Sequence, residues 1–222
     1  MFSLYRLFKP VGAVRFLVGV AALLVLAAPA LAQTFAPGDG FCTYTQGGWG
    51  AVPQGNNPAT ILYSNNNFST VFGGSVEVGI PGSAGFSMQF TTADAITAYL
   101  PAGGKPKPLD KDYPNPITTP SGVFGGQVLA LQLNMLYDSA FGDLTIINTG
   151  TSFDGMTVAA VLDAANQALG GGALPSGYTL SNLNDLASFL NQGFDNCLPS
   201  GWAQQYLTPA SGGGGGSPPP PA

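Results

Sequence analysis

The sequence predicts an α+β domain in which a small antiparallel sheet in the N-terminal half is covered by three to four helices in the C-terminal half, with one disulfide. Three observations support this prediction. Apolar residues alternate with other residues over 76–90, which is the period of strands, and they recur at helical spacing over much of 127–193. The chain has two cysteines, which stand near opposite ends of the region 33–209. We interpret that region as a single domain.

The strongest strand pattern lies in two runs, 76–80 and 86–90. Their alternating apolar residues are Val76, Val78 and Ile80 in the first run and Phe86, Met88 and Phe90 in the second. The segment 81–85 between them has the length and composition of a hairpin turn, so both apolar faces are expected on one side. Before this hairpin, residues 34–60 are rich in Gly, Pro, Asn and Gln. They predict irregular structure with one short strand over 42–45.

Two helical segments are expected in the middle of the chain. The spacing Thr91-x-x-Asp94 is typical of a helix start, and Pro101 ends this short helix, after which a proline-rich loop runs to residue 120. The segment 127–137 fits both a helical face and an alternating strand. We favour helix for it.

The helical pattern is clearest near the C-terminus. Thr157 is expected to N-cap a helix that ends at the glycines 170–172. A further helix is expected to end at Gly193, and its apolar face consists of Leu183, Leu186, Ala187 and Leu190.

Residues 1–32 have the pattern of a secretory signal peptide. Arg6, Lys9 and Arg15 form a basic region, an apolar run follows over 16–28, and Ala30-Leu31-Ala32 is an A-x-A cleavage site. The alternative is an uncleaved membrane anchor, for which the apolar run is short. We therefore expect a secreted protein, located outside the cell or at its surface.

The last residues, 210–222, form a tail of Gly, Ser and Pro. Five consecutive glycines predict a flexible piece, and the prolines 218–221 predict a short polyproline II segment. This tail is either a solvated terminus or a spacer toward a partner.

Charge excludes one class of partner. After signal cleavage three Lys remain against eleven acidic residues, which gives a net charge of −8, and no Arg or His is left. Such a chain lacks the cations that neutralise phosphates, so nucleic acid is excluded as a partner. No later segment approaches about 20 apolar residues, so membrane insertion after cleavage is not expected.

Cys42 and Cys197 are expected to form a disulfide, because an exported chain enters an oxidising compartment. A loop of this length corresponds to a stabilisation on the order of 5 kcal/mol at most. The alternatives are free buried thiols and pairing with another chain.

The segment Cys42-Thr43-Tyr44-Thr45-Gln46-Gly47-Gly48-Trp49 resembles the Cys-Thr/Ser-Tyr-Thr-Gln-Gly-x-Trp motif that opens a group of uncharacterised bacterial secreted domains. The stretches 125–134 and 157–169 are similar to the middle and C-terminal parts of that group. The resemblance covers about residues 42–207 and implies an extracellular or surface setting, with no mechanism attached.

Aromatic residues beside the cysteines are the first candidates for ligand binding. Rings next to amide side chains can stack on sugars while hydrogen-bonding their hydroxyls. The candidates are Tyr44, Gln46, Trp49, Trp202 and Tyr206. The competing and favoured interpretation of Trp49 is packing around the disulfide, in which case Trp202 and Tyr206 are expected to join the same cluster.

Carboxylates offer the remaining chemistry. Asp138 with Asp143, or Asp110 with Asp112, are the candidate pairs for a glycan hydrolase or lyase, which requires two acidic groups. The same four residues are weak candidates for calcium ligands, although no calcium-loop motif accompanies them. No other cofactor is expected.

Together these patterns favour a secreted, non-enzymatic interaction module at the cell surface or in the extracellular space, with carbohydrate, envelope or extracellular matrix as its partner. The first alternative is a carboxylate-based glycan-processing enzyme. The second is a self-assembling structural matrix subunit, because the chain is rich in glycine and poor in charge.

Overall fold

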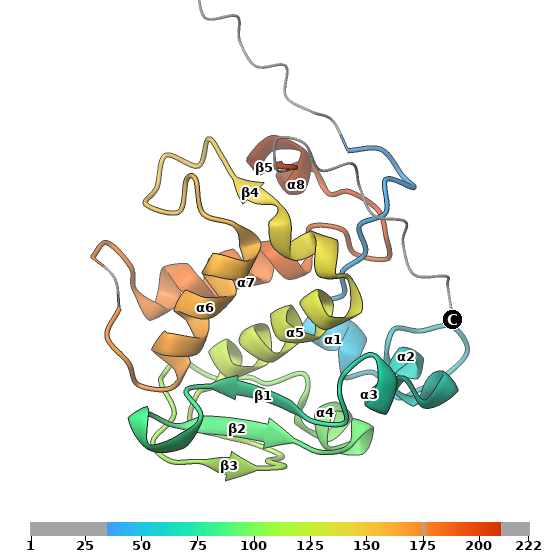
Figure 1. Cartoon of the computed structure of the whole chain (residues 1–222), viewed down its shortest axis with the longest axis vertical. Helices are drawn as coiled ribbons and strands as arrows, with labels where there is room; N and C mark the ends of the chain where they lie inside the picture. The colour runs from blue at the N-terminus through green and yellow to red at the C-terminus, as the bar shows by residue number, and fades with distance from the viewer. Residues whose placement is uncertain (1–34, 175, 210–222) are drawn as a thin grey trace, which may run out of the picture. The chain divides into compact units, whose positions relative to one another are not determined.

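The computed structural model describes residues 35–174 and 176–209, all of which belong to one compact unit. The expected signal peptide and the expected tail lie outside the described residues, so the structure does not test them. Within the described part, the predicted combination of a small sheet in the N-terminal half and longer helices in the C-terminal half is confirmed (Figure 1).

The sheet consists of three strands in the order β1-β2-β3. Their bounds are β1 (Val76–Gly79), β2 (Ser87–Phe90) and β3 (Tyr113–Pro114). A second, two-stranded sheet pairs β4 (Thr145–Ile146) with β5 (Leu207–Thr208) in antiparallel fashion. The helices are α1 (Gln46–Trp49), α2 (Ala59–Tyr63), α3 (Asn67–Thr70), α4 (Ala93–Tyr99), α5 (Val123–Tyr137), α6 (Val158–Leu169), α7 (Leu180–Asn191) and α8 (Gly201–Tyr206). Short 3-10 turns occupy Ser64–Asn66, Gly82–Ala84 and Ser139–Asp143.

The predicted hairpin is confirmed, because β1 and β2 pair in antiparallel register with the turn between them. Val78 and Met88 face each other across this pair and are buried with the rest of its apolar face. Ile80 and Phe86 are exceptions: both lie outside the ladder, Ile80 is half-buried and Phe86 is 39% exposed. The alternating pattern therefore predicted a buried face that was slightly too long at the turn.

The proline-rich loop contains a strand that the pattern did not predict. Two of its residues form β3, which pairs with β2 in parallel, so the sheet is not purely antiparallel. Prolines lower strand propensity in the sequence, yet they are tolerated at a sheet edge, where one side of the backbone needs no partner. The amide N–H of Asn115 continues the pairing by donating to the carbonyl of Gln89 at 2.7 Å.

The helix starts follow from side-chain caps. Thr157 N-caps α6 as predicted, and Thr179 caps α7 in a capping box with Asn182. The cap of α4 differs from the prediction by one residue, because Thr92 accepts from the N–H of Ala95. Thr91 instead exchanges hydrogen bonds with the side chain of Asn115.

The ambiguous segment 127–137 is helical and forms most of α5. This helix lies in the middle of the domain, between the hairpin on one side and α6 and α7 on the other (Figure 1). A helix with neighbours on several sides is apolar nearly all round, which blurs its periodicity. That burial explains why its sequence fitted two patterns.

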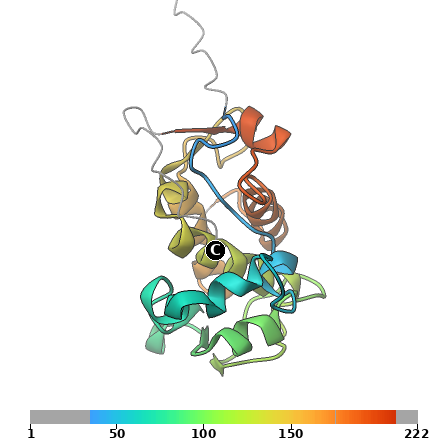
Figure 2. The same cartoon turned by 90° about the vertical axis from the view of Figure 1, so that its right-hand side faces the viewer.

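The region 34–60, expected to be irregular, contains the short helices α1 and the start of α2. The expected strand over 42–45 reduces to a single parallel bridge between Thr43 and Asp195. Helix α8, which was not expected, begins at the N-cap Ser200 and lies at the opposite end of the domain from the three-stranded sheet (Figures 1 and 2). Helices α1, α2 and α8 are too short for their sequences to show the hydrophobic periodicity of a helix.

Candidate functional site

The predicted disulfide between Cys42 and Cys197 is formed, with a sequence separation of 155. It ties the segment before α1 to the loop after α7. Beside it, Thr43 donates its backbone N–H to the carbonyl of Phe194 at 2.9 Å, and its hydroxyl accepts from the N–H of Phe194 at 3.0 Å. Hydrogen bonds between Thr43 and Phe194 therefore join the same two segments that the disulfide links.

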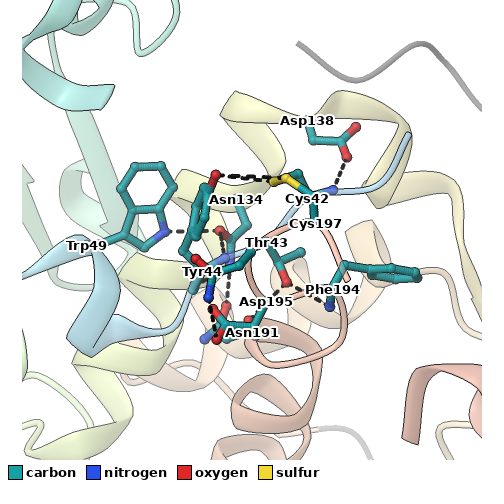
Figure 3. Close-up of a disulfide and its surroundings, with 11 residues drawn as sticks. Cys42, Thr43, Tyr44, Trp49, Asn134, Asp138, Asn191, Phe194, Asp195 and Cys197 are labelled. Atoms are coloured by element: carbon teal, nitrogen blue, oxygen red, sulfur yellow. Dashed lines mark hydrogen bonds between the residues drawn. A yellow bond between two sulfur atoms is a disulfide. The ribbon is translucent and has the colours of Figure 1, made fainter. Parts of the chain in front are cut away.

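Asn134 of α5 is the centre of the buried network beside the disulfide (Figure 3). Its Oδ1 accepts from the backbone N–H of Tyr44 at 2.8 Å and from the indole Nε1–H of Trp49 at 3.0 Å. Its Nδ2 donates to the Tyr44 carbonyl and to Oδ1 of Asn191, both at 2.9 Å. All four bonds go to buried polar groups. The Asn134 amide therefore supplies the hydrogen-bond partners that water would supply at the surface.

A second amide extends the network to the start of α5. Asn191 donates from Nδ2 to the carbonyl of Gln127 at 3.0 Å and to its Oε1 at 2.8 Å. The carbonyl of Asn191 accepts from the Thr43 hydroxyl at 3.0 Å. Asn191 therefore connects α7 both to α5 and to the segment that carries Cys42.

Gln46 is held by contacts of the same kind. Its Oε1 accepts from the backbone N–H of Ala102 at 3.0 Å, and the side chain lies against Gly126 of α5. A Cβ at residue 126 would overlap with Oε1 of Gln46. Glycine is therefore needed at position 126 for the side chain of Gln46 to approach α5 this closely.

Trp49 and Tyr44 belong to the core. Trp49 is 0% exposed and makes edge-on contacts with the rings of Tyr44, Phe72 and Tyr137. The Tyr44 hydroxyl lies 3.2 Å from Sγ of Cys42, and since a disulfide sulfur carries no proton, the hydroxyl is the donor. Burial, reinforced by the neighbouring Tyr137, raises the pKa of Tyr44.

Asp138 completes the set around the bridge. Its Oδ2 accepts from the backbone N–H of Cys42 at 2.9 Å, and the side chain is 6% exposed. Burial raises the pKa of this carboxyl, and the hydrogen bond from Cys42 opposes that rise. We call Cys42, Thr43, Tyr44, Gln46, Trp49, Gly126, Gln127, Asn134, Asp138, Asn191 and Cys197 the clamp.

The clamp changes the interpretation of three predicted binding residues. Tyr44 and Trp49 are buried, and the side-chain oxygen of Gln46 is engaged by Ala102, so none of the three presents a surface on which a ligand can stack. The favoured alternative for Trp49, packing beside the disulfide, agrees with its position. The motif residues and the 125–134 stretch contact each other, which gives both a structural role.

Trp202 and Tyr206 lie elsewhere. They stand on α8, and Trp202 stacks on Phe189 of α7 with ring centroids 5.3 Å apart and an interplanar angle of 9°. Tyr206 also contacts Trp202, with ring centroids 5.6 Å apart and an interplanar angle of 45°. The expectation that they join the Trp49 cluster is wrong: among the aromatic contacts of the described residues, none links the two groups.

A groove runs along this aromatic pair, with a cavity volume of about 180 Å³. Its apolar lining residues are Phe189, Trp202, Phe153 and Leu186. Its polar lining residues are Thr149, Thr151, Asn182 and Asp185. Within residues 35–174 and 176–209, the indole N–H of Trp202 has no hydrogen-bond acceptor. We call this site the aromatic groove.

The aromatic groove has a sequence signal that was missed. Asn182, Asp185 and Phe189 are spaced i, i+3, i+7 and share one face of α7, which borders the buried leucine face at Leu186. Phe189 is 47% exposed on that otherwise polar face. A large aromatic residue outside the apolar stripe of an amphipathic helix is the pattern that indicates a surface role.

A second groove, of about 270 Å³, lies over the outer face of the hairpin. It brings together Glu77 and Asp112, a pairing that residue spacing did not predict. The Ser87 hydroxyl donates to Oε1 of Glu77 at 2.6 Å, and the Ser87 N–H donates to Oδ1 of Asp112 at 2.9 Å. Gln89 and Tyr113 also line this site, which we call the sheet groove.

The other candidate carboxylates are dispersed. Asp110 accepts from the Tyr113 hydroxyl at 2.7 Å, Asp143 is exposed, and Asp138 is buried in the clamp. Among the residues that the structure describes, no three His, Cys, Asp or Glu side chains are grouped as metal ligands would be. Calcium binding stays a prediction without a site.

None of the helices in the described ranges has both the length and the apolar character needed to cross a membrane. The chain matches no protein-family model, and searches of the curated proteins and of the solved structures find nothing similar to it. Any functional argument therefore rests on the geometry of the clamp and the two grooves.

Proposed function

We propose that this protein is a secreted, non-enzymatic binding module, and that its ligand site is the aromatic groove. One observation carries the proposal: two stacked aromatic rings, Phe189 and Trp202, lie at a surface cavity instead of in the core. Aromatic residues left at the surface beside a concave site are typical of recognition surfaces.

The chemistry of the groove favours an uncharged, hydroxyl-rich ligand such as a polysaccharide. The rings offer apolar faces to the C–H groups of a sugar, and the Trp202 N–H stands nearby as a hydrogen-bond donor. The side chains of Asn182, Thr149 and Thr151 are engaged in hydrogen bonds within the chain. Asp185 is the charged residue of the lining, and its carboxylate accepts hydrogen bonds from hydroxyls. An acidic chain would repel anionic polymers, so neutral glycans are the first class to test.

The test is a pull-down of residues 33–222, with the disulfide intact, on insoluble neutral polysaccharides and purified cell envelopes. We expect saturable retention that Trp202→Ala and Phe189→Ala each reduce at least about tenfold, corresponding to roughly 1.4 kcal/mol of binding free energy. Phe86→Ala is the matched control, since Phe86 has a similar exposure but lies beside the hairpin turn. Retention that is unchanged in both groove variants would overturn the proposal.

The sheet groove favours a second candidate function, a carboxylate-based glycan-processing enzyme. Glu77 and Asp112 line one groove and both accept hydrogen bonds from Ser87, so this groove holds the two acidic groups that glycoside chemistry requires as a minimum. Release of reducing ends from soluble glycans, abolished by both Glu77→Gln and Asp112→Asn but not by Asp143→Asn, would support the enzyme. A self-assembling subunit would instead show light scattering that rises with protein concentration.

A further inference from the structure

We propose that the disulfide of the clamp is a site of thiol–disulfide exchange, in which an external thiolate attacks Sγ of Cys197 and Cys42 is the leaving group. The ligand class is therefore a thiol, which becomes joined to the protein through a mixed disulfide at Cys197. The proposal concerns the clamp, so it does not depend on what the aromatic groove binds.

The two halves of the disulfide differ in accessibility. Cys42 is 1% exposed, and its neighbours Tyr44 and Asp138 are also buried. Cys197 is exposed, and so are Asn196 and Leu198 on either side of it. Exchange requires that the attacking thiolate reaches one of the two sulfurs. An external thiolate therefore reaches this bond at Cys197, and the sulfur that leaves is that of Cys42.

The backbone at Cys197 is in an unusual conformation. Asn196 and Cys197 both have left-handed backbone angles, with φ of 54° and 61°. Asparagine adopts this region readily, whereas other residues that carry a Cβ seldom do. Such a conformation persists because its surroundings hold it. Two constraints act on Cys197, the disulfide and the hydrogen bond from its N–H to the carbonyl of Phe194 at 2.9 Å. Breaking the S–S bond removes one of them, which favours opening at this residue.

A hydroxyl group lies at the leaving sulfur. The Tyr44 hydroxyl is 3.2 Å from Sγ of Cys42 and 4.0 Å from Sγ of Cys197 (Figure 3). Burial raises the pKa of Tyr44, so the hydroxyl keeps its proton at neutral pH and above. Hydrogen bonds to a charged acceptor are stronger than those to a neutral one. As negative charge develops on the departing Cys42 sulfur, the Tyr44 hydroxyl therefore stabilises it.

The exchange is balanced without any other reactant. The external thiol loses its proton to water, and its thiolate forms a bond with Sγ of Cys197. The bond between the two Sγ atoms breaks, and its electron pair goes to Cys42, which then takes a proton from water. The external sulfur is oxidised to the disulfide level while Cys42 is reduced, so no further oxidant or reductant is needed.

The clamp keeps the two cysteines together after the bond opens. Thr43 remains bonded to the carbonyls of Asn191 and Phe194 at 3.0 and 2.9 Å. The N–H of Cys42 remains bonded to Asp138 at 2.9 Å. Cys42 is then held as a free thiol beside the mixed disulfide. Its attack on Cys197 expels the external thiol and restores the original bond, so the capture of a thiol is reversible.

Nearby charge selects among thiols. The carboxylate of Asp138 lies at the N–H of Cys42. Asp195 is two residues before Cys197, and its charge contributes to raising the pKa of Tyr44, so it acts on the same place. A site with negative charge of this kind repels anionic reactants and attracts cations. We therefore expect cationic thiols to react faster than anionic ones, with a difference that salt reduces.

The first experiment determines which sulfur is attacked. Oxidised residues 33–222 are treated with 2-mercaptoethanol, quenched with acid, alkylated with N-ethylmaleimide in denaturant, digested with pepsin and assigned by mass spectrometry. We expect mercaptoethanol on Cys197 with maleimide on Cys42 to exceed the reverse pattern at least about tenfold, because access decides which sulfur is attacked. Equal amounts of the two patterns, or an excess of the reverse, would overturn the proposal.

A second measurement separates exchange in the folded protein from exchange after unfolding. The rate is followed in urea concentrations below the unfolding transition. Attack on an exposed sulfur of the folded protein is expected to give a rate that changes little with urea. A rate that rises from zero urea with the full dependence of global unfolding would overturn the proposal, because the thiol would then react with the unfolded chain.

A pair of tyrosine variants tests the stabilisation of the leaving group. Tyr44→Phe is expected to slow exchange in the folded protein at least about fivefold, since it removes a donor to a charged sulfur. Tyr99→Phe is the matched control, because Tyr99 is also buried and its hydroxyl lies beside those of Thr119 and Ser121. Equal rates in the two variants would overturn the role of Tyr44.

Thiols of different charge test the selectivity. Cysteamine, 2-mercaptoethanol and 3-mercaptopropionate are compared, and each rate is divided by the rate of the same thiol on the urea-unfolded chain. This ratio removes the intrinsic reactivity of each thiol. We expect the ratio for cysteamine to exceed that for 3-mercaptopropionate at least about threefold at low salt. Equal ratios would overturn the selectivity for cationic thiols.

Discussion

The two tryptophans of this chain are in opposite situations. The N–H of Trp49 donates to Asn134, and its ring is enclosed by other aromatic side chains. Trp202 stacks on Phe189 at the edge of a cavity, and its N–H has no acceptor within the described ranges. The comparison shows that the residue type does not distinguish a structural aromatic from a candidate binding aromatic. What distinguishes them is whether their polar group is already satisfied.

The same comparison holds for the regions around the two residues. In the clamp, polar side chains are buried and point at backbone groups from distant parts of the chain. In the aromatic groove, polar side chains line an open cavity. A motif rich in Thr, Tyr, Gln and Trp can therefore be a structural device, although its composition is that of a ligand site.

Truncating each tryptophan tests most directly whether the two sites differ. We expect Trp49→Ala to lower the free energy of unfolding by about 4 to 5 kcal/mol, since it removes a fully buried ring and leaves an acceptor on Asn134 unpaired. Trp202→Ala is expected to cost about 2 kcal/mol, because its half-buried ring packs on Phe189 and Tyr206 and borders the core. Urea unfolding followed by circular dichroism measures both. Equal losses would show that the two sites are not different in kind.

The clamp depends on one amide more than on any other side chain. Asn134→Ala leaves the N–H groups of Tyr44 and Trp49 without acceptors and the Tyr44 carbonyl without a donor. With about 1 to 3 kcal/mol for each orphaned group, we expect a loss on the order of 4 kcal/mol. Asn56→Ala, at an exposed turn, is the control and is expected to be neutral. A loss below about 1 kcal/mol would mean that water reaches the network.

The disulfide stabilises the clamp and is not part of the aromatic groove, so removing it tests the two sites separately. Replacing Cys42 and Cys197 together by Ser is expected to cost about 3 kcal/mol, because the unfolded chain regains the entropy of a long loop. Dithiothreitol is expected to lower the stability of the wild-type chain by a similar amount and to leave the double variant unchanged. Ligand retention at the aromatic groove should persist in the folded fraction of both. Loss of retention without loss of folding would place the ligand at the clamp.

The smallest effect concerns the charge buried in the clamp. Burial raises the pKa of Asp138 in the folded state above its unfolded value of 3.8. The folded state therefore holds this proton more tightly, so the contribution of Asp138 to stability falls as pH rises from about 3.8 through the folded pKa. Asp138→Asn keeps an acceptor for the Cys42 N–H and removes the charge.

We thus expect the stability of Asp138→Asn relative to the wild-type chain to increase across that window and to level off above it. Urea unfolding at several pH values from 3 to 7 measures the difference curve. Asp143→Asn, at an exposed position, is the control. A difference that stays flat with pH would show that Asp138 is solvated in the folded protein.

Local patterns in the sequence determined a large part of this fold. The β1–β2 hairpin, α6 with its Thr157 cap and the apolar face of α7 each depend on residues close together in the chain, so periodicity and capping predicted them. The disulfide followed from the count of two cysteines. Where the pattern was lost or misleading, as in α5, β3 and α1, tertiary neighbours decided the local structure.

Only the tertiary structure decided which side chains belong together. Asn134 meets Tyr44 across 90 positions and Asn191 across 57, and the two-carboxylate groove joins Glu77 to Asp112 through Ser87. Such contacts depend on how helices and strands pack, which a linear pattern does not encode. The sequence determined the β1–β2 hairpin, α6 and α7 because their hydrogen bonds are local. Whether a tryptophan became core or surface depended on partners far away in sequence, and that assignment directs the functional proposal to Trp202.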